Sequence, residues 1–257
     1  MLKQKVLQSF KREIVKQPCI GIFSKTTDSN FVEAAGYAGL SFIILDIEHG
    51  IATQETISNH IRAAILSDLF PIVRVSGVNV HEIGVALDSG ALGVQVPNIS
   101  TAEQAKESIH AAKFHPKGMR GTCRFVRAAN FGMIEKQDYF HDANESLVIL
   151  QVEGVEGVNN LDAILDVSGF DVLFIGPYDL AQSIGKPGQV DSPEVLKLMR
   201  NIANKAKEKG VVVGAFSDNV KRNKSLMKEG FNFIACSVDV NIFSMAIHNL
   251  IEGKNCE

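Results

Sequence analysis

The chain has 257 residues, 46% of them hydrophobic, which is enough to bury one large core or two small ones. Its formal net charge is -3, and acids and bases are scattered along the whole length, so we expect binding neither to nucleic acid nor to a membrane. No window approaches the roughly 18 apolar residues needed to span a bilayer. The cysteines lie far apart and form no C-x-x-C pair, which predicts reduced thiols in a cytoplasmic protein; they are Cys19, Cys123, Cys236 and Cys256.

Residues 1–16 have the charged, amphipathic pattern of a helix and lack the unbroken apolar core of a signal peptide. Short runs rich in β-branched or aromatic residues follow. Most of them are continuously apolar, which is typical of strands covered on both faces. The predicted strands are 19–24, 42–48, 70–76, 93–97, 147–153, 172–176, 211–217 and 233–239.

Segments with helical spacing separate most of these strands. A Ser-Pro pair at 192–193 is typical of a helix start, and Gly90, Gly210 and Gly230 stand where helices should end. The alternation predicts an α/β fold, a closed (β/α)8 TIM barrel in a single domain over residues 1–257, in preference to an open doubly wound sheet. The predicted helices are 29–38, 52–67, 79–88, 101–113, 155–166, 193–209, 219–229 and 240–251.

The segment 114–146 interrupts this alternation, because it is too long and too polar for an ordinary connection. Long loops in compact domains are usually functional or disordered. Three arginines in it, Arg120, Arg124 and Arg127, are interleaved with phenylalanines and suit anion binding or covering of the barrel mouth. An oligomer contact or a solvated flap explains the same composition.

Two acids follow strand-like runs in the segment 147–180. Glu153 closes LVILQVE, and Asp179 lies just beyond VLFIG on a Gly-Pro turn. The strand–helix–strand unit between them is parallel and right-handed, so both acids emerge at the same edge of the sheet. Either acid alone is explained as a solvated loop residue, but two in register favour a metal site for Mg²⁺ or Mn²⁺. Strand alternation places Gln151 on the same face as Glu153.

Barrel enzymes carry their chemistry at the C-terminal ends of the strands. A lone histidine is more often structural than catalytic, but His49 closes a D-I-E-H run at a strand end, where Asp46 is placed to accept an imidazole N–H and fix the tautomer. Arg74 lies inside an apolar strand and either pairs with a core carboxylate or reaches an anionic substrate. The other polar residues at these ends are Lys25, Glu48, Gln95, Ser217, Asp218 and Asp239.

Two related chemistries lack the residues that they need. A Schiff-base aldolase needs a desolvated lysine, but the predicted strands contain none, and only Lys25 is near the right face. Phosphosugar barrels bind phosphate through glycine-rich turns after strands 7 and 8, and FSDNV and SVDVN lack that character. We therefore expect a substrate without a phosphate group.

The order of these motifs resembles the HpcH/HpaI aldolase family, metal-dependent class II aldolases that cleave 2-keto-4-hydroxy acids to pyruvate and an aldehyde. The resemblance rests on DIEH, VRV, LDSGA, QVE and GPYDL and runs through most of residues 31–190. It implies that Glu153 and Asp179 hold a divalent cation, Mg²⁺ or Mn²⁺ before Co²⁺. It also implies that His49 is the base, acting through a water on that cation with Asp46 tuning it, and that Arg74 contacts the keto or enolate oxygen of pyruvate.

The resemblance extends to the substrate carboxylate and to assembly. It places the backbone turn of Gly176, Pro177, Tyr178 and Asp179 at the pyruvate carboxylate, and Gln151 beside the cation. It implies a ring-like homo-oligomer, a hexamer or a trimer, in which the C-terminal helix 240–251 is exchanged between subunits. Asp88 or Arg120 would then reach a neighbour's site. The loop FVRAANFG lacks a tryptophan that many relatives carry, which leaves the aldehyde open.

Two other functions remain as alternatives. An acyl-CoA lyase of the malyl or citramalyl type uses a related barrel, but it needs a basic surface for the CoA diphosphate, which only the region from Arg120 to Arg127 suggests. A catalytically silent barrel that serves as a binding module is the second alternative, and the presence of both Glu153 and Asp179 speaks against it.

Overall fold

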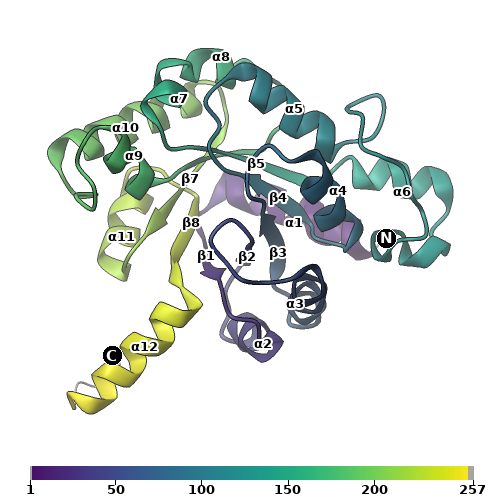
Figure 1. Ribbon diagram of the computed structural model, residues 1–257, viewed down its shortest axis with the longest axis horizontal. Helices are drawn as coiled ribbons and strands as arrows, with labels where there is room; N and C mark the ends of the chain where they lie inside the picture. The colour runs from purple at the N-terminus through teal and green to yellow at the C-terminus, as the bar shows by residue number, and fades with distance from the viewer. Residues whose placement is uncertain (1, 254–257) are drawn as a thin grey trace.

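The computed structural model describes residues 2–253 as a barrel of parallel strands surrounded by helices (Figure 1). The strands follow one another around the barrel in chain order, and β8 pairs with β1 to close it. The predicted (β/α)8 barrel is therefore confirmed. The strands are β1 (Cys19–Ser24), β2 (Phe42–Asp46), β3 (Phe70–Arg74), β4 (Gly93–Val96), β5 (Leu147–Val152), β6 (Val172–Ile175), β7 (Val212–Ser217) and β8 (Phe233–Val238).

Alternate residues of each strand serve two separate cores. In β2, Ile43 and Leu45 pack in the core beneath the surrounding helices, whereas Phe42 and Ile44 fill the barrel interior. The N-terminal helix α1 (Leu2–Lys16) contributes Phe10 to the interior core and closes the N-terminal end of the barrel. The inward series 42, 44 continues to position 46, so the last inward side chain of a strand stands above an apolar floor at the C-terminal end.

Outside segment 114–146, the helices match the predicted ones within about two residues, with two differences. The predicted helix 155–166 is two short helices, and a helix that we did not predict follows β6 directly. Ser192 caps α10, and Gly90, Gly210 and Gly230 have positive φ at helix ends, as predicted. The helices after α1 are α2 (Ser29–Tyr37), α3 (Gln54–Leu66), α4 (Val80–Asp88), α5 (Ala102–Ala112), α7 (Val155–Asn159), α8 (Leu161–Leu165), α9 (Pro177–Ser183), α10 (Pro193–Glu208), α11 (Val220–Lys228) and α12 (Asp239–Ile251).

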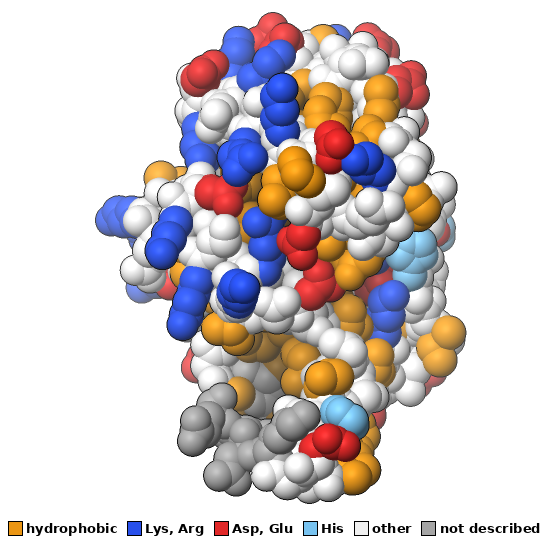
Figure 2. All heavy atoms as spheres, turned by 90° about the vertical axis from the view of Figure 1, so that its left-hand side faces the viewer, with side chains coloured by type: hydrophobic (Ala, Val, Ile, Leu, Met, Phe, Trp, Pro, Cys, Tyr) orange, Lys and Arg blue, Asp and Glu red, His pale blue; other side chains and the backbone are white. Residues whose placement is uncertain are grey.

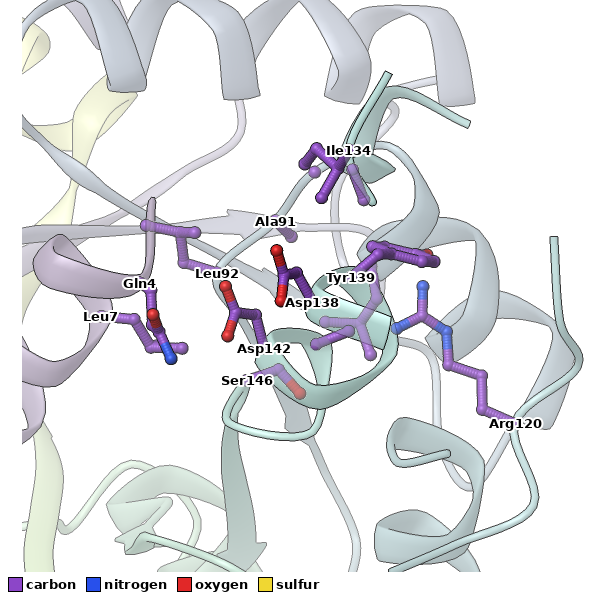
Figure 3. A pocket seen from close by; sticks show the side chains of 14 residues that line it. Gln4, Leu7, Ala91, Leu92, Arg120, Ile134, Asp138, Tyr139, Asp142 and Ser146 are labelled. Carbon is purple, nitrogen blue, oxygen red and sulfur yellow. The ribbon is translucent and has the colours of Figure 1, made fainter. Parts of the chain in front are cut away.

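The segment 114–146 folds into a 3-10 helix, η1 (Arg127–Gly132), and a helix, α6 (Lys136–Ala143), around a small core of its own. It packs beside α1 at the N-terminal end of the barrel (Figure 1), where the two enclose a cavity of about 280 Å³ (Figure 3). Of the roles considered for this segment, covering the barrel mouth is therefore contradicted. The reason is that the segment packs around a second apolar cluster, which includes Phe114 and Tyr139, at the opposite end.

The last helix, α12, projects from the barrel instead of packing on it (Figure 1). Seven of its apolar side chains are each at least 41% exposed, and Figure 2 shows hydrophobic side chains on the surface in this lower part of the molecule. Its contact with the helical layer includes Phe243 against Phe31 of α2, with ring centroids 5.8 Å apart. No helix within residues 2–253 is long and apolar enough to cross a membrane. The cysteines at 19, 123 and 236 are free, and Cys256 lies outside the described residues.

Candidate active site

A cavity of about 550 Å³ opens at the C-terminal end of the strands. The inward series of β3 ends at Arg74, and that of β5 continues through Gln151 to Glu153, so alternation brings these side chains over the same apolar floor. His49, which follows β2, and Asp179, in the first turn of α9, also line the cavity. The predicted residues from strands 2, 3, 5 and 6 therefore do meet at one mouth.

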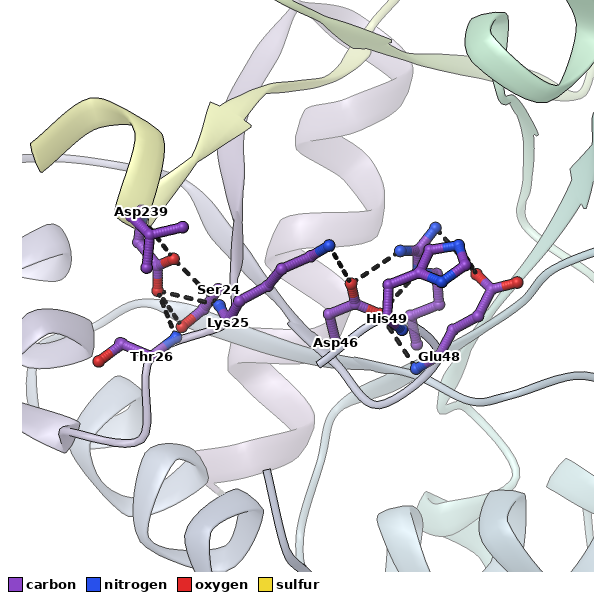
Figure 4. A network of polar contacts seen from close by, with 9 residues as sticks. Ser24, Lys25, Thr26, Asp46, Glu48, His49 and Asp239 are labelled. Carbon is purple, nitrogen blue, oxygen red and sulfur yellow. Dashed lines mark hydrogen bonds and ion pairs between the residues drawn. The ribbon is translucent and has the colours of Figure 1, made fainter. Parts of the chain in front are cut away.

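Arg74 is buried and is neutralised by two carboxylates. Its Nε and Nη2 donate to Asp46 at 3.0 and 2.8 Å, and its Nη1 lies 3.0 Å from Glu48 Oε2 (Figure 4). The guanidinium also lies over the ring of Phe23, 4.5 Å from the centroid. Of the two alternatives for this arginine, pairing with a core carboxylate is the one observed. Two of its five N–H donors have no partner in these contacts.

Asp46 accepts hydrogen bonds from the side chain of Arg74 and not from the imidazole of His49. This corrects our prediction that Asp46 fixes the tautomer of His49. Asp46 Oδ1 accepts backbone N–H groups from Glu48 and His49 at 3.1 and 3.3 Å, and Arg74 occupies both oxygens. Burial opposes ionisation, but the hydrogen bonds and charge of Arg74 outweigh it and lower the pKa of Asp46. The His49 ring is 59% exposed, with Nε2 3.9 Å from Glu48 Oε2. It therefore faces the cavity.

Glu153 is buried, and a chain of amides orients it. Its Oε1 accepts the backbone N–H of Asn98 at 2.9 Å, and its Oε2 accepts from Gln151, whose own oxygen accepts from Gln95. A side chain at Gly176 would place a Cβ 2.2 Å from Oε2, so only glycine leaves room for the carboxylate. Gln151 thus lies inward beside Glu153, as strand alternation predicted.

Burial, with a smaller contribution from nearby Asp179, raises the pKa of Glu153 to about 7. Asp179 is exposed to the cavity, and its charge also raises the pKa of Glu48 after the larger effect of burial. Neighbouring carboxylates that repel each other in this way fit a divalent cation, and their oxygen donors suit a hard one. No group of three or more His, Cys, Asp or Glu residues with metal-ligand geometry occurs within residues 2–253. Glu153 and Asp179 both line the cavity.

Several side chains at the mouth were missed or left without a role by our sequence reasoning. Tyr178 donates through its hydroxyl to Asp218 Oδ1 at 2.6 Å, a hydrogen bond that raises the pKa of Tyr178 to about 12. Lys25 reaches the cavity from the end of β1, and Ser237 and Asn241 reach it from β8 and α12. Lys25 continues the inward-facing alternation of Cys19 and Phe23 in β1, and this pattern could have identified it. No local pattern marks Ser237, which adopts a positive φ of 67° at the end of β8.

Asp88 and Arg120 lie at the other end of the barrel. Arg120 is buried and pairs with Asp88, at the end of α4, within the same chain. Arg124 donates to backbone carbonyls of its own segment, and Arg127 donates to the carbonyl of Ser89 at 3.2 Å. Of the three arginines, Arg120 is thus neutralised by an acid, and the other two guanidinium groups donate to backbone carbonyls. The predicted reach of Asp88 or Arg120 into a neighbour's site stays a prediction.

A single buried lysine occurs within residues 4–253, and it is far from the mouth. Lys113 donates to the carbonyl and hydroxyl of Ser146, just before β5, and burial lowers the pKa of Lys113 to about 8. This position is at the N-terminal end of the strands. A Schiff-base mechanism at the mouth therefore has no desolvated lysine within the described residues.

Comparison with known proteins agrees with this site. A model of the HpcH/HpaI aldolase/citrate lyase family matches residues 19–246. The 2-keto-3-deoxy-L-rhamnonate aldolase of Klebsiella pneumoniae is 33% identical over 93% of this chain and 90% of that protein. The protein of the same name from Salmonella gallinarum is 33% identical over 89% of this chain and 85% of that protein.

Solved structures show the same architecture. A crystal structure of an HpcH/HpaI aldolase/citrate lyase family protein from Burkholderia cenocepacia J2315 has a TM-score of 0.90 at 30% identity, covering 95% of this chain and 98% of that one. An HpcH/HpaI aldolase from Desulfitobacterium hafniense DCB-2 has a TM-score of 0.88 at 25% identity, covering 97% and 95%. The chain therefore belongs to the HpcH/HpaI aldolase/citrate lyase family, as its motifs predicted, and is a lyase of the aldolase class.

Proposed function

We propose that the protein cleaves a 2-keto-4-hydroxy acid to pyruvate and an aldehyde as a divalent-metal-dependent class II aldolase. The observation that carries this proposal is the buried Glu153 beside Asp179, with Arg74 and His49 facing the same cavity. The relatives are named for a 2-keto-3-deoxy sugar acid, and compounds of this type are the first substrates to test. Bound Mg²⁺ or Mn²⁺, with Co²⁺ as a further candidate, would polarise the keto group and offset the negative charge of the pyruvate enolate.

Glu153 and Asp179 are the proposed ligands of the cation. Gln151 orients the Glu153 carboxylate, and Gly176 leaves the space that it occupies. The backbone of the turn that begins α9, with Pro177 and Tyr178, is the proposed contact for the pyruvate carboxylate, as the family resemblance implies. These groups hold one end of the substrate against β5 and β6.

Arg74 and His49 carry the proposed bond cleavage. His49 accepts the proton of the C4 hydroxyl, the bond between C3 and C4 breaks, and its electron pair forms the pyruvate enolate while C4 becomes the aldehyde carbon. Arg74, held by Asp46 and Glu48, points its remaining N–H donors at the oxygen on which charge develops. The enolate then takes up a proton at C3. An imidazole suits the first step because it exchanges a proton readily near neutral pH.

We also propose that the protein assembles as a homo-oligomer in the cytoplasm through α12. An apolar helix face that projects from its own barrel is stabilised when a second copy covers it. Exchange of α12 between subunits of a trimer or hexamer would do this. Replacement of Phe243 by Asp should lower the particle mass measured by light scattering, and an unchanged mass would contradict the exchange.

The aldolase proposal is tested without knowing the aldehyde. Pyruvate in deuterium oxide should exchange its C3 protons in the presence of the protein and Mg²⁺ or Mn²⁺, and EDTA should abolish the exchange. Glu153→Gln should slow it by about 10³-fold, because loss of cation binding removes several kcal/mol of charge stabilisation. The matched control is Glu156→Gln, on the exposed side of α7, which should exchange at the normal rate. Exchange that is indifferent to metal, EDTA and Glu153→Gln would refute the proposal.

A further inference from the structure

The mouth cavity has a second side that the proposed cation and pyruvate contacts leave unused. Arg74 ends β3, and Glu153 and Gly176 directly follow β5 and β6, whereas the side formed by β1, β7, β8 and the start of α12 has no role so far. The cavity of about 550 Å³ is larger than pyruvate needs, so the aldehyde fragment must lie against this second side. Its side chains include Lys25, Phe216, Ser237, Val238 and Asn241.

Lys25 is held at the mouth by a buried anchor. Its backbone N–H donates to both oxygens of Asp239, at 3.0 and 3.1 Å, and the Ser24 hydroxyl donates to the same carboxylate at 2.6 Å (Figure 4). The N–H of Thr26 adds a further bond at 3.2 Å. Asp239 is itself buried at the start of α12. The loop that carries Lys25 is therefore fixed, and its side chain extends across the mouth toward Asp46.

The ammonium of Lys25 forms a long ion pair with Asp46, and Lys25 and Arg74 together balance the charges of Asp46 and Glu48. The Lys25 ammonium and the Asp46 carboxylate are 3.6 Å apart, longer than a hydrogen bond. Asp46 already accepts four bonds, two from Arg74 and two from backbone N–H groups, and a carboxylate offers about four acceptor sites. Lys25 is one-third exposed and keeps its donors available toward the cavity. A cation fixed in a cavity with unused donors indicates a ligand that carries negative charge there.

We propose that Lys25 is a specificity-determining residue that binds the aldehyde fragment and selects aldehydes carrying a carboxylate over neutral ones. The inference rests on the proposed aldolase function. A carboxylate on the aldehyde forms a charge-assisted hydrogen bond with the ammonium, whereas the corresponding methyl group leaves the ammonium desolvated against the Phe23 and Phe216 side of the cavity. Lys25 takes no part in the proton transfer or in the enolate contacts.

The test compares aldehydes that differ only in a carboxylate and a methyl group: glyoxylate with acetaldehyde, and 4-oxobutanoate with butanal. With pyruvate and Mn²⁺, kcat/KM of the wild-type protein should favour the carboxylated member of at least one pair by about tenfold, the size expected for one hydrogen bond between charged groups. Lys25→Met should remove this preference, and Lys25→Arg should retain most of it. Lys228→Met, at the exposed C-terminal end of α11, is the matched control.

Deuterium exchange into pyruvate without aldehyde separates this inference from the function on which it rests. Lys25→Arg, which keeps the charge beside Asp46, should exchange at about the wild-type rate, and Lys25→Met should still show metal-dependent exchange, which also shows that this variant is folded. Absence of exchange in the wild-type protein would refute the aldolase itself. Normal exchange with no preference within either aldehyde pair, or an equal loss for charged and neutral aldehydes in Lys25→Met, would overturn the role of Lys25.

Discussion

The two ends of the barrel each bury an arginine between an aspartate and a phenylalanine ring, yet the surroundings of the two arginines differ. At the mouth, Arg74 pairs with Asp46 over Phe23; at the N-terminal end, Arg120 pairs with Asp88 and lies 4.7 Å from the centroid of the Phe114 ring. Both arginines line a cavity, but Arg74 has a second carboxylate, that of Glu48, beside it, whereas Arg120 has a buried Nε without a partner. The same pairing of charges therefore occurs at both ends, and the mouth differs because Glu153, Asp179 and His49 line the same cavity as Arg74.

Replacing each arginine by lysine should separate these roles, with the largest effect at the mouth. Lysine keeps the charge but loses the planar fork that binds a carboxylate with two hydrogen bonds. Arg74→Lys should slow metal-dependent exchange into pyruvate by about 10²-fold, the usual cost of removing a donor that stabilises a developing oxyanion. Arg120→Lys should instead lower the free energy of unfolding by about 1–2 kcal/mol, measured by urea titration.

The rate at which folded Arg120→Lys exchanges deuterium into pyruvate then tests whether Arg120 contributes to a neighbouring subunit's site. A loss comparable to that of Arg74→Lys in the assembled protein would support the family-based prediction that this end reaches a neighbour's site. If Arg74→Lys exchanged deuterium into pyruvate at the wild-type rate while Arg120→Lys did not, the active site would have to be assigned to the N-terminal end of the barrel and not to the mouth.

The two ends also each bury an ionisable group whose pKa is shifted. At the mouth, burial and a neighbouring carboxylate raise the pKa of Glu153, which a cation would reverse; at the N-terminal end, burial lowers the pKa of Lys113 to about 8. Because the unfolded chain titrates this lysine near its ordinary value of 10.5, the unfolded chain binds more protons between these two values. The contribution of Lys113 to the free energy of unfolding should therefore rise as pH rises through that range.

The measurement is the difference in the free energy of unfolding between wild type and Lys113→Met. Between about pH 8 and pH 9.5, the free energy of unfolding of the wild type should increase by about 2 kcal/mol relative to that of Lys113→Met. Lys224→Met, in which an exposed lysine of α11 is replaced, should show no such change. A difference independent of pH would mean that Lys113 keeps an ordinary pKa.

Much of the site could be predicted because strand periodicity determines which side chains point inward. Phe42 and Ile44 precede Asp46 in the same phase, and the parity of β5 places Gln151 with Glu153. The family motifs added the identity of the metal ligands and of the reaction. The barrel, the family and the lyase class are confirmed, whereas the roles of individual site residues remain proposals.

What could not be predicted depends on contacts between distant segments. Asp46 meets Arg74 because β2 and β3 pair these two residues in register, and no local pattern showed that this partner would exclude the His49 ring. Two arginines of segment 114–146, Arg120 and Arg127, have their partners at the end of α4, so no pattern within the segment could identify these contacts. The short helix α9 was missed because it has only seven residues and follows a Gly-Pro turn.

The smallest expected effect concerns the link between α9 and the loop after β7. Tyr178 donates to Asp218 across the mouth and immediately precedes Asp179. Tyr178→Phe removes this one hydrogen bond, worth about 0.5–1 kcal/mol at an exposed position, so metal-dependent exchange into pyruvate should fall about two- to fivefold through weaker binding of Mn²⁺. Tyr37→Phe is the matched control, because the Tyr37 hydroxyl also donates to an acid, Glu33, but on the surface of α2. Equal effects of the two substitutions would show that the link does not position Asp179, and the mouth would then depend on β2, β3 and β5 alone.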